Sequence, residues 1–311
     1  MSGDGVIVAE RILRGTAGTR VRTGYPIAPM TSFRLGGPAA LYLEAESDAD
    51  LSGAAEAVDR SGIAWTVIGK GSNLLVSDAG FPGLVLRLGK PFRWAAREGS
   101  TLRAGGAMPL PALAGIALAH GLAGLEFAVA IPATLGGAVR MNAGAHRGSM
   151  DGVLETLDLF SMANGGSRRL PAGDAGFAYR RSALPGGSIV LGAVLALAPG
   201  VPAEIRAAMD EARAWRRQTQ PVGEPNCGSV FKNPPGDHAA RLVESAGGKE
   251  LSFGGARVSS KHANFIVATP GATASDVLQL IGKIQERVEE RFGVRLEREV
   301  QLVGDFDTSP V

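Results

Sequence analysis

A polar turn between two prolines holds the most chemically suggestive residues of the chain. Between Pro225 and Pro234 lie the hydroxyl of Ser229, the ammonium group of Lys232 and the amide of Asn233. Polar groups crowded into a rigid loop are typical of a functional site. Ser229 could act as an acyl-transfer nucleophile, but it lacks the Gly-x-Ser-x-Gly context and no histidine is committed to it. The sequence around Ser229 therefore favours a role for its hydroxyl as a proton donor.

The same turn contains Cys227, the single cysteine among 311 residues. Its thiol could be reactive, but a small buried side chain is the more ordinary role. One cysteine excludes an intramolecular disulfide and is typical of a reducing compartment. The four histidines lie far apart in the sequence, so we expect no zinc site.

A glycine-rich loop follows a short β-rich run over residues 63–68. Its residues are Gly69, Lys70, Gly71, Ser72 and Asn73. Glycines let backbone N–H groups turn inward toward a phosphate, and two polar side chains add donors. The loop lacks the third glycine of a Rossmann fingerprint, and the chain has no Walker A sequence. A phosphate-binding loop and a tight turn between strands both remain open.

A second glycine-rich stretch runs from Ile131 to Gly148, and little of it can be regular helix. Its small residues would permit close approach to a flat or anionic group, but a tightly packed crossing between domains explains them equally well. Two such loops in one chain favour a large, extended cofactor. The candidate contacts in this stretch are Thr134, Gly136, Gly137, Asn142, Ala143 and Gly144.

Two further segments carry charge that could act in chemistry. Arg180 follows Tyr179, and a bidentate donor beside an aromatic ring suits a carboxylate, although most such arginines are simply solvated. Near the C-terminus, apolar and polar residues alternate, which places Glu297 and Glu299 on one polar face. Periodicity does not choose between these glutamates, and a solvated face would explain both.

Strands and helices must position these residues. The sequence shows signals for both kinds of element, and this mixture predicts an α+β fold. We expect strands over residues 40–46, 63–68, 84–88, 154–162, 188–197, 264–268 and 294–303. We expect helices from an Asp48 or Asp50 cap to Gly62, over 109–120, 203–217 and 239–246, and along the stripe Val277, Ile281, Ile284, Val288 and Phe292 to Gly293. Residues 1–30 show no strong periodicity, so we expect them to drape over the first domain or fray.

The bulk composition bounds the class of protein. A chain of 311 residues, 45% of them hydrophobic, indicates a packed protein of two or three domains, with a boundary near Pro199-Gly200. A net charge of +2 with scattered basic residues disfavours nucleic acid and suits a small anionic ligand. The N-terminus shows no secretory pattern, and no apolar run reaches the roughly 18 residues of a membrane span. We expect a cytoplasmic protein, monomeric or weakly oligomeric, with no membrane partner.

Seven motifs, taken in order, resemble those of one family. They are Thr31–Ala39, Gly69–Asp78, Gly136–Gly144, Tyr179–Ser182, Gly228–Pro234, Lys261–Phe265 and Glu299-Val300. Together they resemble the UDP-N-acetylenolpyruvoylglucosamine reductase (MurB) family over about residues 28–304. The resemblance implies a vanillyl-alcohol-oxidase-like, PCMH-type FAD-binding region of two subdomains, followed by a C-terminal α+β substrate-binding domain. The expected division is an N-terminal segment 1–32, the FAD-binding region 33–199, the substrate domain 200–304 and a tail 305–311.

The resemblance also implies a reaction and its catalytic residues. NADPH would reduce the flavin and leave, and flavin N5 would then pass hydride to UDP-N-acetylglucosamine enolpyruvate, giving UDP-N-acetylmuramate for peptidoglycan synthesis. Arg180 and Glu299, the latter as a hydrogen-bond donor, would stabilise the enolate-like charge, and Ser229 would deliver the proton to the adjacent carbon. Candidate substrate contacts are Tyr179, Lys232, Asn233 and Lys261.

Some positions depart from the commoner family pattern. Ala133 stands where glycine is usual, Asn226 where serine is frequent, and His146 where an aromatic tyrosine or phenylalanine is expected. The short connection after Ser182 resembles the compact second type of the family, which lacks a substrate-covering tyrosine loop, so we expect an open or differently closed substrate channel. Two alternatives are another flavin oxidoreductase of the same fold and a flavin- or nucleotide-binding regulator without catalysis. The three catalytic residues together argue against both.

Overall fold

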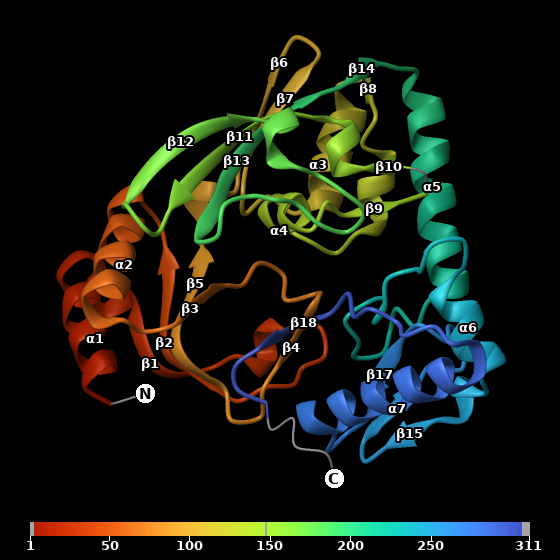
Figure 1. Ribbon diagram of the computed structural model, residues 1–311. Coiled ribbons are helices and arrows are strands. Elements are labelled where there is room, and N and C mark those ends of the chain that lie inside the picture. The colour runs from red at the N-terminus through yellow and green to blue at the C-terminus, as the bar shows by residue number, and fades with distance from the viewer. Residues whose placement is uncertain (1–2, 147, 307–311) are drawn as a thin grey trace. The chain divides into compact units, whose positions relative to one another are not determined.

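The computed structural model describes residues 3–146 and 148–306, which form an α+β fold as expected (Figure 1). The chain packs as two units. Unit 1 comprises the residues up to 23 together with 41–70 and 83–215, and unit 2 comprises 24–40, 71–82 and the residues from 216. Each unit is therefore assembled from segments that are distant in sequence. The predicted N-terminal segment and tail fall partly on residues 1–2 and 307–311, which lie outside the described residues.

The first sheet lies mostly in unit 1 and has the strand order β1-β2-β5-β3. Its strands are β1 (Val21–Pro26), β2 (Pro38–Ala45), β5 (Phe81–Leu88) and β3 (Trp65–Val67). Strands β3 and β5 run parallel, with Thr66 opposite Val85. The helices α1 (Gly3–Ala17) and α2 (Asp48–Ser61) cover one face of this sheet (Figure 1). Leu13, Leu43 and Leu51 are fully buried in the core that results.

Helix α2 begins at a capping box, although not at the residue that we expected. Ser47 is the N-cap: its hydroxyl accepts from the Asp50 backbone N–H, and the Asp50 carboxylate accepts from the Ser47 backbone N–H. The expectation of an Asp48 or Asp50 cap was therefore wrong. The helix ends as expected at Gly62, whose φ of 65° is in the left-handed region that glycine adopts without steric cost.

We expected residues 1–30 to drape over the first domain or fray, and the described residues up to 23 pack against the rest of unit 1 as regular structure. Helix α1 and strand β1 occupy most of this segment. The buried positions of α1 are Ala9, Leu13 and Ala17, spaced four residues apart. Two of the three are alanines, which give only a weak hydrophobic signal, so the helical period is difficult to read from the sequence.

The second sheet of unit 1 is antiparallel, with the strand order β12-β11-β13-β7-β6. Its strands are β12 (Gly166–Pro171), β11 (Leu154–Ser161), β13 (Ser188–Ala196), β7 (Thr101–Gly105) and β6 (Ala95–Glu98). The helices α3 (Leu110–Ala119) and α4 (Leu135–Arg140) contribute to the core beside this sheet. Two short strand pairs complete the region, β8 (Leu122–Ala123) with β14 (Ala198–Pro199) and β9 (Gly144–Ala145) with β10 (Gly148–Ser149). Unit 1 thus contains two separate hydrophobic cores.

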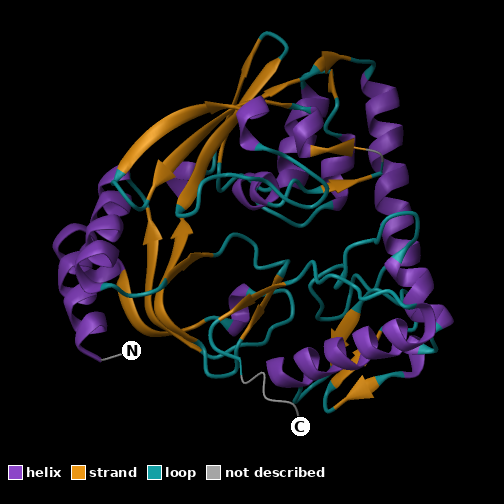
Figure 2. Cartoon of the chain, viewed as in Figure 1, coloured by secondary structure: helices purple, strands orange, loops and turns teal. Residues whose placement is uncertain are grey.

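Unit 2 is built on a three-stranded antiparallel sheet of order β15-β16-β17, shown with its helices in Figure 2. Its elements are β15 (Ser252–Phe253), β16 (Ala256–Val258), β17 (Ile266–Ala268), α6 (Ala239–Ser245) and α7 (Ala274–Phe292). Helix α7 starts at a second capping box, Thr273 with Asp276, and ends at Gly293 as expected. Four of the five residues of its predicted stripe are buried, and Phe292 is half-buried.

The predicted strand over residues 294–303 is wrong in its length. Only β18 (Gln301–Val303) is a strand, and it pairs in parallel with β4 (Leu74–Val76). Arg298 forms a single bridge to Phe231, so the preceding residues follow an irregular path.

The remaining helix is α5 (Pro202–Thr219). The 3-10 turns are η1 (Gly18–Arg20), η2 (Ala28–Met30), η3 (Lys90–Phe92), η4 (Glu126–Ala130), η5 (Met150–Gly152), η6 (Ala172–Ala175) and η7 (Gly248–Glu250). None of the described helices has the length and apolar character of a membrane span.

Candidate functional site

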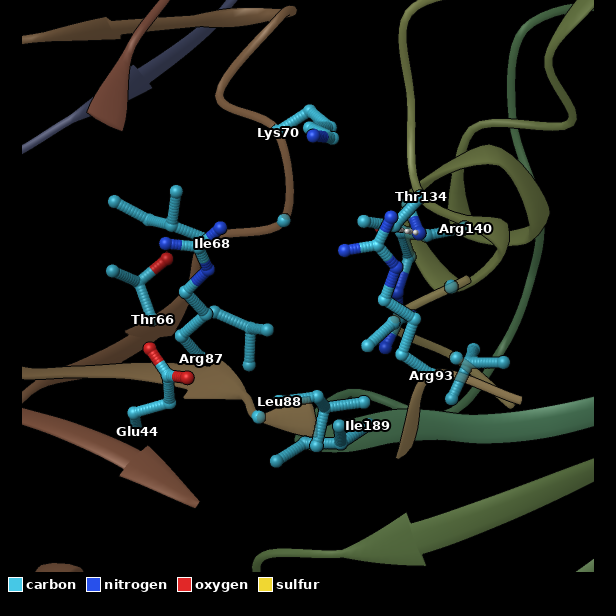
Figure 3. Close-up of a pocket in the computed structure, with 18 of the residues that line it drawn as sticks. Glu44, Thr66, Ile68, Lys70, Arg87, Leu88, Arg93, Thr134, Arg140 and Ile189 are labelled. Atoms are coloured by element: carbon cyan, nitrogen blue, oxygen red, sulfur yellow. Dashed lines mark hydrogen bonds between the residues drawn. The ribbon is translucent and has the colours of Figure 1, made fainter. Parts of the chain in front are cut away.

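A cavity of about 650 Å³ lies within unit 1. Its walls come from β3, the C-terminal end of β5, the start of α4 and the start of β13. Figure 3 shows Glu44, Thr66 and Arg87 on one wall and Thr134 and Arg140 on the facing wall. The volume is typical of a pocket for a small molecule or cofactor.

The lining of this cavity is strongly basic. Its cations are Lys70, Arg87, Lys90, Arg93 and Arg140. Among the described residues that line it, Glu44 is the one acidic residue. Burial lowers the pKa of Arg140, but an arginine remains charged at any ordinary pH. A cavity lined mainly by one sign of charge concentrates ligands of the opposite sign, so this cavity suits an anionic ligand such as a diphosphate.

Glu44 is held in place by the buried Tyr42, which lies two residues before it on β2. The Tyr42 hydroxyl donates to Glu44 Oε2 at 3.1 Å. Burial is the main cause that raises the pKa of Tyr42 to about 12, and the negative charge of Glu44 is the second. The nearby Arg87 opposes this shift. Tyr42 therefore stays protonated and keeps Glu44 as a fixed hydrogen-bond acceptor at the cavity.

The loop Gly69–Asn73 has backbone donors without protein acceptors. Within the part of the chain that the structure describes, the N–H groups of Gly69, Lys70, Gly71 and Ser72 donate to no protein atom. Gly71 has a φ of 59°, and a Cβ there would lie 2.1 Å from the Met30 carbonyl oxygen. A Cβ on Gly69 would lie 2.5 Å from Thr134 Oγ1. Glycine is therefore required at position 71, a side chain at position 69 would displace the Thr134 hydroxyl, and the free donors match a phosphate-binding loop.

Thr134, Gly136 and Gly137 line the cavity at the start of α4. Thr134 is the N-cap, and its hydroxyl accepts from Gly137 N at 3.3 Å. Gly136 N donates to Gly106 O at 2.9 Å, and a Cβ on Gly136 would lie 3.1 Å from the Val190 carbonyl oxygen. The small residues let this helix pack close against β13 at the cavity.

Asn142, Ala143 and Gly144 follow α4 and are not among the residues that line the cavity. Asn142 is buried, and protein groups satisfy both ends of its amide: Nδ2 donates to Ala178 O at 3.1 Å, and Oδ1 accepts from Asp151 N at 3.0 Å. A cofactor contact from these three residues stays a prediction.

Tyr179 and Arg180 form the tip of a tight turn in unit 1. Ala178 and Arg181 exchange backbone hydrogen bonds of 3.0 and 3.1 Å across its base. Arg180 has a φ of 55°, which is uncommon for a residue with a side chain and is a feature of strained functional turns. Its guanidinium lies 5.4 Å from the centre of the Tyr179 ring, and Tyr179 is 54% exposed.

Ser229 lies in unit 2 in a turn held by two asparagines. Asn226 Oδ1 accepts from Gly228 N at 2.9 Å, so the departure from serine at position 226 contributes to the turn itself. The buried Asn264 binds both backbone groups of Phe231, accepting at 2.9 Å and donating at 2.8 Å. Ser229 is half-buried, and among the described residues its hydroxyl has no hydrogen-bond partner. This hydroxyl is therefore available to a ligand.

Unit 2 brings Glu299 beside the segment that carries Ser229. Glu299 N donates to Val230 O at 2.8 Å, and Asn73 Nδ2 donates to Glu299 O at 3.1 Å. Burial, followed by the Glu299 carboxylate, raises the pKa of Cys227 well above its ordinary value. Cys227 is 3% exposed, which confirms that it is a small buried residue and not a reactive thiol.

The candidate substrate contacts of unit 2 already have protein partners. Lys232 forms an ion pair with the exposed Glu297, and Lys261 donates to the Arg217 carbonyl oxygen. Asn233 Oδ1 accepts from Ala239 N at 3.0 Å, at the start of α6. Their contacts to a substrate stay predictions.

The sequence interpretation missed much of the cavity wall. It did not single out Glu44, Arg87, Lys90, Arg93 or Arg140 as site residues. One signal was present in the glycines at strand ends: Gly89 follows β5, and Gly106 follows β7. A Cβ on Gly106 would lie 2.1 Å from Val190 O, so the close approach of two backbones explains that glycine.

Comparisons with known proteins assign these features to one family. Residues 220–303 match the family model described as UDP-N-acetylenolpyruvoylglucosamine reductase, C-terminal domain, and residues 39–167 match the model described as FAD binding domain. The chain is 48% identical over 286 residues to UDP-N-acetylenolpyruvoylglucosamine reductase 2 of Symbiobacterium thermophilum, covering 92% of each protein. It is 44% identical over 297 residues to the reductase of an Anaeromyxobacter species, covering 96% of this chain and 92% of that protein.

A solved structure gives the same assignment. The crystal structure of the reductase (MurB) from Thermus caldophilus matches with a TM-score of 0.80 and 36% identity, covering 91% of this chain and 99% of that one. The expected fold, with its FAD-binding region and C-terminal domain, is confirmed, as is FAD as the cofactor. The basic cavity and the donor-rich glycine loop fit that dinucleotide. The chain belongs to the UDP-N-acetylenolpyruvoylglucosamine reductase family and is an FAD-dependent enzyme of that activity.

Proposed function

We propose that the chain uses NADPH to reduce the enolpyruvyl ether of UDP-N-acetylglucosamine to UDP-N-acetylmuramate, a peptidoglycan precursor, and that it does so in the cytoplasm. The observation that carries this proposal is the basic cavity of unit 1 beside a glycine loop with free N–H donors. Family membership supports the substrate class. We also propose the domain limits 33–199 and 200–304 for the cofactor and substrate regions.

The cavity residues would hold the cofactor. The N–H groups of the loop at Gly69 and Lys70 and the cations of the lining would bind the diphosphate, while Thr134 and the glycines of α4 would allow its close approach. When bound and reduced by NADPH, the flavin would supply the hydride that the reduction of the substrate requires. Glu44, held by Tyr42, offers an acceptor for a hydroxyl or amino group of the cofactor.

Arg180 would bind the substrate carboxylate and stabilise the negative charge that develops next to it. A guanidinium matches a carboxylate with two parallel hydrogen bonds. Because the turn holds Arg180 before the substrate arrives, little reorganisation is needed as charge develops.

Ser229 would give a proton to the carbon that becomes carbanionic after hydride transfer. A serine hydroxyl is a poor acid, so it can act only toward a strongly basic acceptor of this kind. Asn264 fixes the backbone next to Ser229, which limits the motion of the hydroxyl. Glu299, whose backbone is bonded to Val230, would act as a hydrogen-bond donor to the enolate-like oxygen.

Lys232, Lys261, Asn233 and Tyr179 would bind the sugar nucleotide. The present partner of Lys232, Glu297, is 73% exposed. The Lys232 side chain is only 17% exposed, so it needs an anionic partner, and a diphosphate would take the place of the exposed Glu297 carboxylate.

A flavin assay tests the whole proposal. The purified protein should show a flavin absorbance spectrum, NADPH should bleach it under anaerobic conditions, and the enolpyruvyl sugar nucleotide should restore it. A protein that binds no FAD, or a bleached flavin that this substrate leaves reduced, would refute the proposed reaction.

The Ser229→Ala variant tests the proton donor. NADPH should still bleach its flavin, whereas product formation should fall by about 10² or more, the usual contribution of general acid catalysis. Ser252→Ala is the matched control, because Ser252 is an exposed serine of β15. Near-normal turnover of Ser229→Ala would remove Ser229 from this role.

A further inference from the structure

The turn that carries Arg180 is hydrogen-bonded on both sides to one short segment. Before the turn, Asn142 Nδ2 donates to Ala178 O at 3.1 Å. After the turn, Ser182 Oγ donates to the Arg140 carbonyl oxygen at 2.7 Å. The Arg140 carbonyl and the Asn142 amide both belong to residues 140–142, at the end of α4 and directly after it. The turn therefore has fixed contacts at its entrance and at its exit.

The orientation of the Asn142 amide is determined by its two partners. Nδ2 faces a carbonyl oxygen, and Oδ1 faces the Asp151 N–H at 3.0 Å, so a flipped amide would lose both hydrogen bonds. Asn142 is only 4% exposed, where an unsatisfied polar group is costly. It also has a φ of 42°. Two residues with left-handed backbones, Asn142 and Arg180, are thus connected through Ala178, and such strain persists only where surrounding contacts impose it.

We propose that Asn142 is a positioning residue for Arg180, and that the hydrogen bond of Ser182 positions the same turn from its other side. The inference rests on the proposed catalytic role of Arg180. Helix α4 lines the cofactor cavity with Gly136 and Gly137 and ends at Arg140. The same short helix therefore connects the cavity wall to the turn that presents the guanidinium.

Asn142→Asp tests this inference with little change of shape. The aspartate keeps an acceptor for Asp151 N but places an oxygen against Ala178 O. We expect substrate-driven reoxidation of the flavin to slow about 10- to 100-fold relative to NADPH-driven bleaching, the loss that a misplaced catalytic group causes. FAD bound per protein should stay at the wild-type level. Loss of FAD, or equal slowing of both half-reactions, would overturn the inference in favour of a cofactor contact.

A double-mutant cycle separates positioning from catalysis. In an Arg180→Ala background, Asn142→Asp should slow reoxidation by less than about twofold, because a residue that acts through Arg180 has nothing left to position. Independent, multiplying losses would contradict the inference. If Arg180→Ala alone reoxidises normally, the proposed role of Arg180 fails. If Arg180→Ala is slow but Asn142→Asp is normal, only the positioning role fails.

Two further variants guard against a folding defect. Ser182→Ala removes the exit contact and should slow reoxidation selectively, so the test stands even if Asn142→Asp does not fold. Ser47→Ala removes the cap of α2, at the other core of unit 1, and should lower the melting temperature while both half-reactions keep their wild-type ratio. Selective slowing in Ser47→Ala would assign the effect to general destabilisation and overturn the inference.

Discussion

At the scale of single residues, two buried asparagines organise the candidate catalytic groups. Asn264 holds the backbone beside Ser229, and Asn142 holds the turn of Arg180. Each uses both ends of its amide, which donates and accepts at fixed positions. The sequence indicates Asn142 as a polar residue among small neighbours, but it does not tell whether a cofactor or the protein itself satisfies the amide.

The glycine loop gives a prediction at this scale. Gly71→Ala should strongly reduce bound FAD and destabilise the protein by about 1–3 kcal/mol, because its Cβ would overlap the Met30 carbonyl oxygen at 2.1 Å. Flavin absorbance per protein and denaturant unfolding measure the two effects.

Gly62→Ala is the matched control for Gly71→Ala. Gly62 has a similar φ of 65°, but no atom lies within 4 Å of a Cβ built there. It should cost only about 1 kcal/mol of backbone strain and leave the FAD content unchanged. Equal FAD loss in both variants would show that the close approach at Gly71 is irrelevant.

At the scale of elements, an ion pair anchors the start of α2 to the turn after α1. The Arg20 guanidinium binds both carboxylate oxygens of Asp50, at 2.5 and 2.7 Å, and Asp50 is 1% exposed. Burial raises the pKa of Asp50, but the Arg20 side chain and the backbone N–H of Glu46 outweigh it and leave the pKa below its ordinary value. The sequence alone suggests only that Asp50 is a helix cap.

This anchor predicts a specific pH dependence. A carboxyl whose pKa is lowered by folding adds stability that is fully present above its unfolded pKa of about 4 and is lost as the pH falls through its folded pKa. At pH 6 the free energy of unfolding of Asp50→Asn should therefore be about 2–3 kcal/mol lower than that of wild type. The loss is smaller than for a fully buried ion pair, because Arg20 is partly exposed. Its stability should also fall less steeply below pH 4.

Denaturant unfolding from pH 6 to pH 2 measures both effects of Asp50→Asn. Asp48→Asn, an exposed residue in the first turn of α2, should follow the wild-type curve. A constant difference between wild type and Asp50→Asn across this range would contradict the assignment.

Also at this scale, two of the sequence motifs pack against each other in unit 2. Gly37 N donates to Ser77 O at 2.8 Å, and a Cβ on Gly37 would lie 2.3 Å from Asp78 O. The carboxylate of Asp78 in turn accepts from the first N–H groups of α7, those of Ala274 and Ser275, at 2.7 and 2.9 Å. These contacts give the glycines and the aspartate of the motifs a structural role that spacing alone does not reveal.

At the scale of the whole molecule, the cofactor should contribute measurably to stability. FAD at 100 times its dissociation constant should add about 2.7 kcal/mol to the unfolding free energy of the flavin-free protein. Riboflavin at the same concentration should add less, because it lacks the phosphates that Lys70, Arg87 and Arg93 would bind. Thermal melting with each ligand tests this, and equal stabilisation by both would argue against phosphate binding in the cavity.

The sequence by itself determined the features that depend on local rules. The apolar stripe and terminal glycine of α7, the Gly62 end of α2 and the two glycine-rich loops are readable because helical period and left-handed turns involve residues close together in the chain. Helix α1 was missed because two of its three buried residues are alanines, and the last strand was overextended because alternation continues through irregular backbone.

Only the tertiary structure decided which polar groups meet. Asn73 binds the backbone of Glu299 across 226 positions, and Arg87 joins Arg140 in one basic cavity. No local period carries such pairings, because the partner of a side chain is chosen by how whole strands and helices pack, and this packing depends on contacts far apart in the sequence.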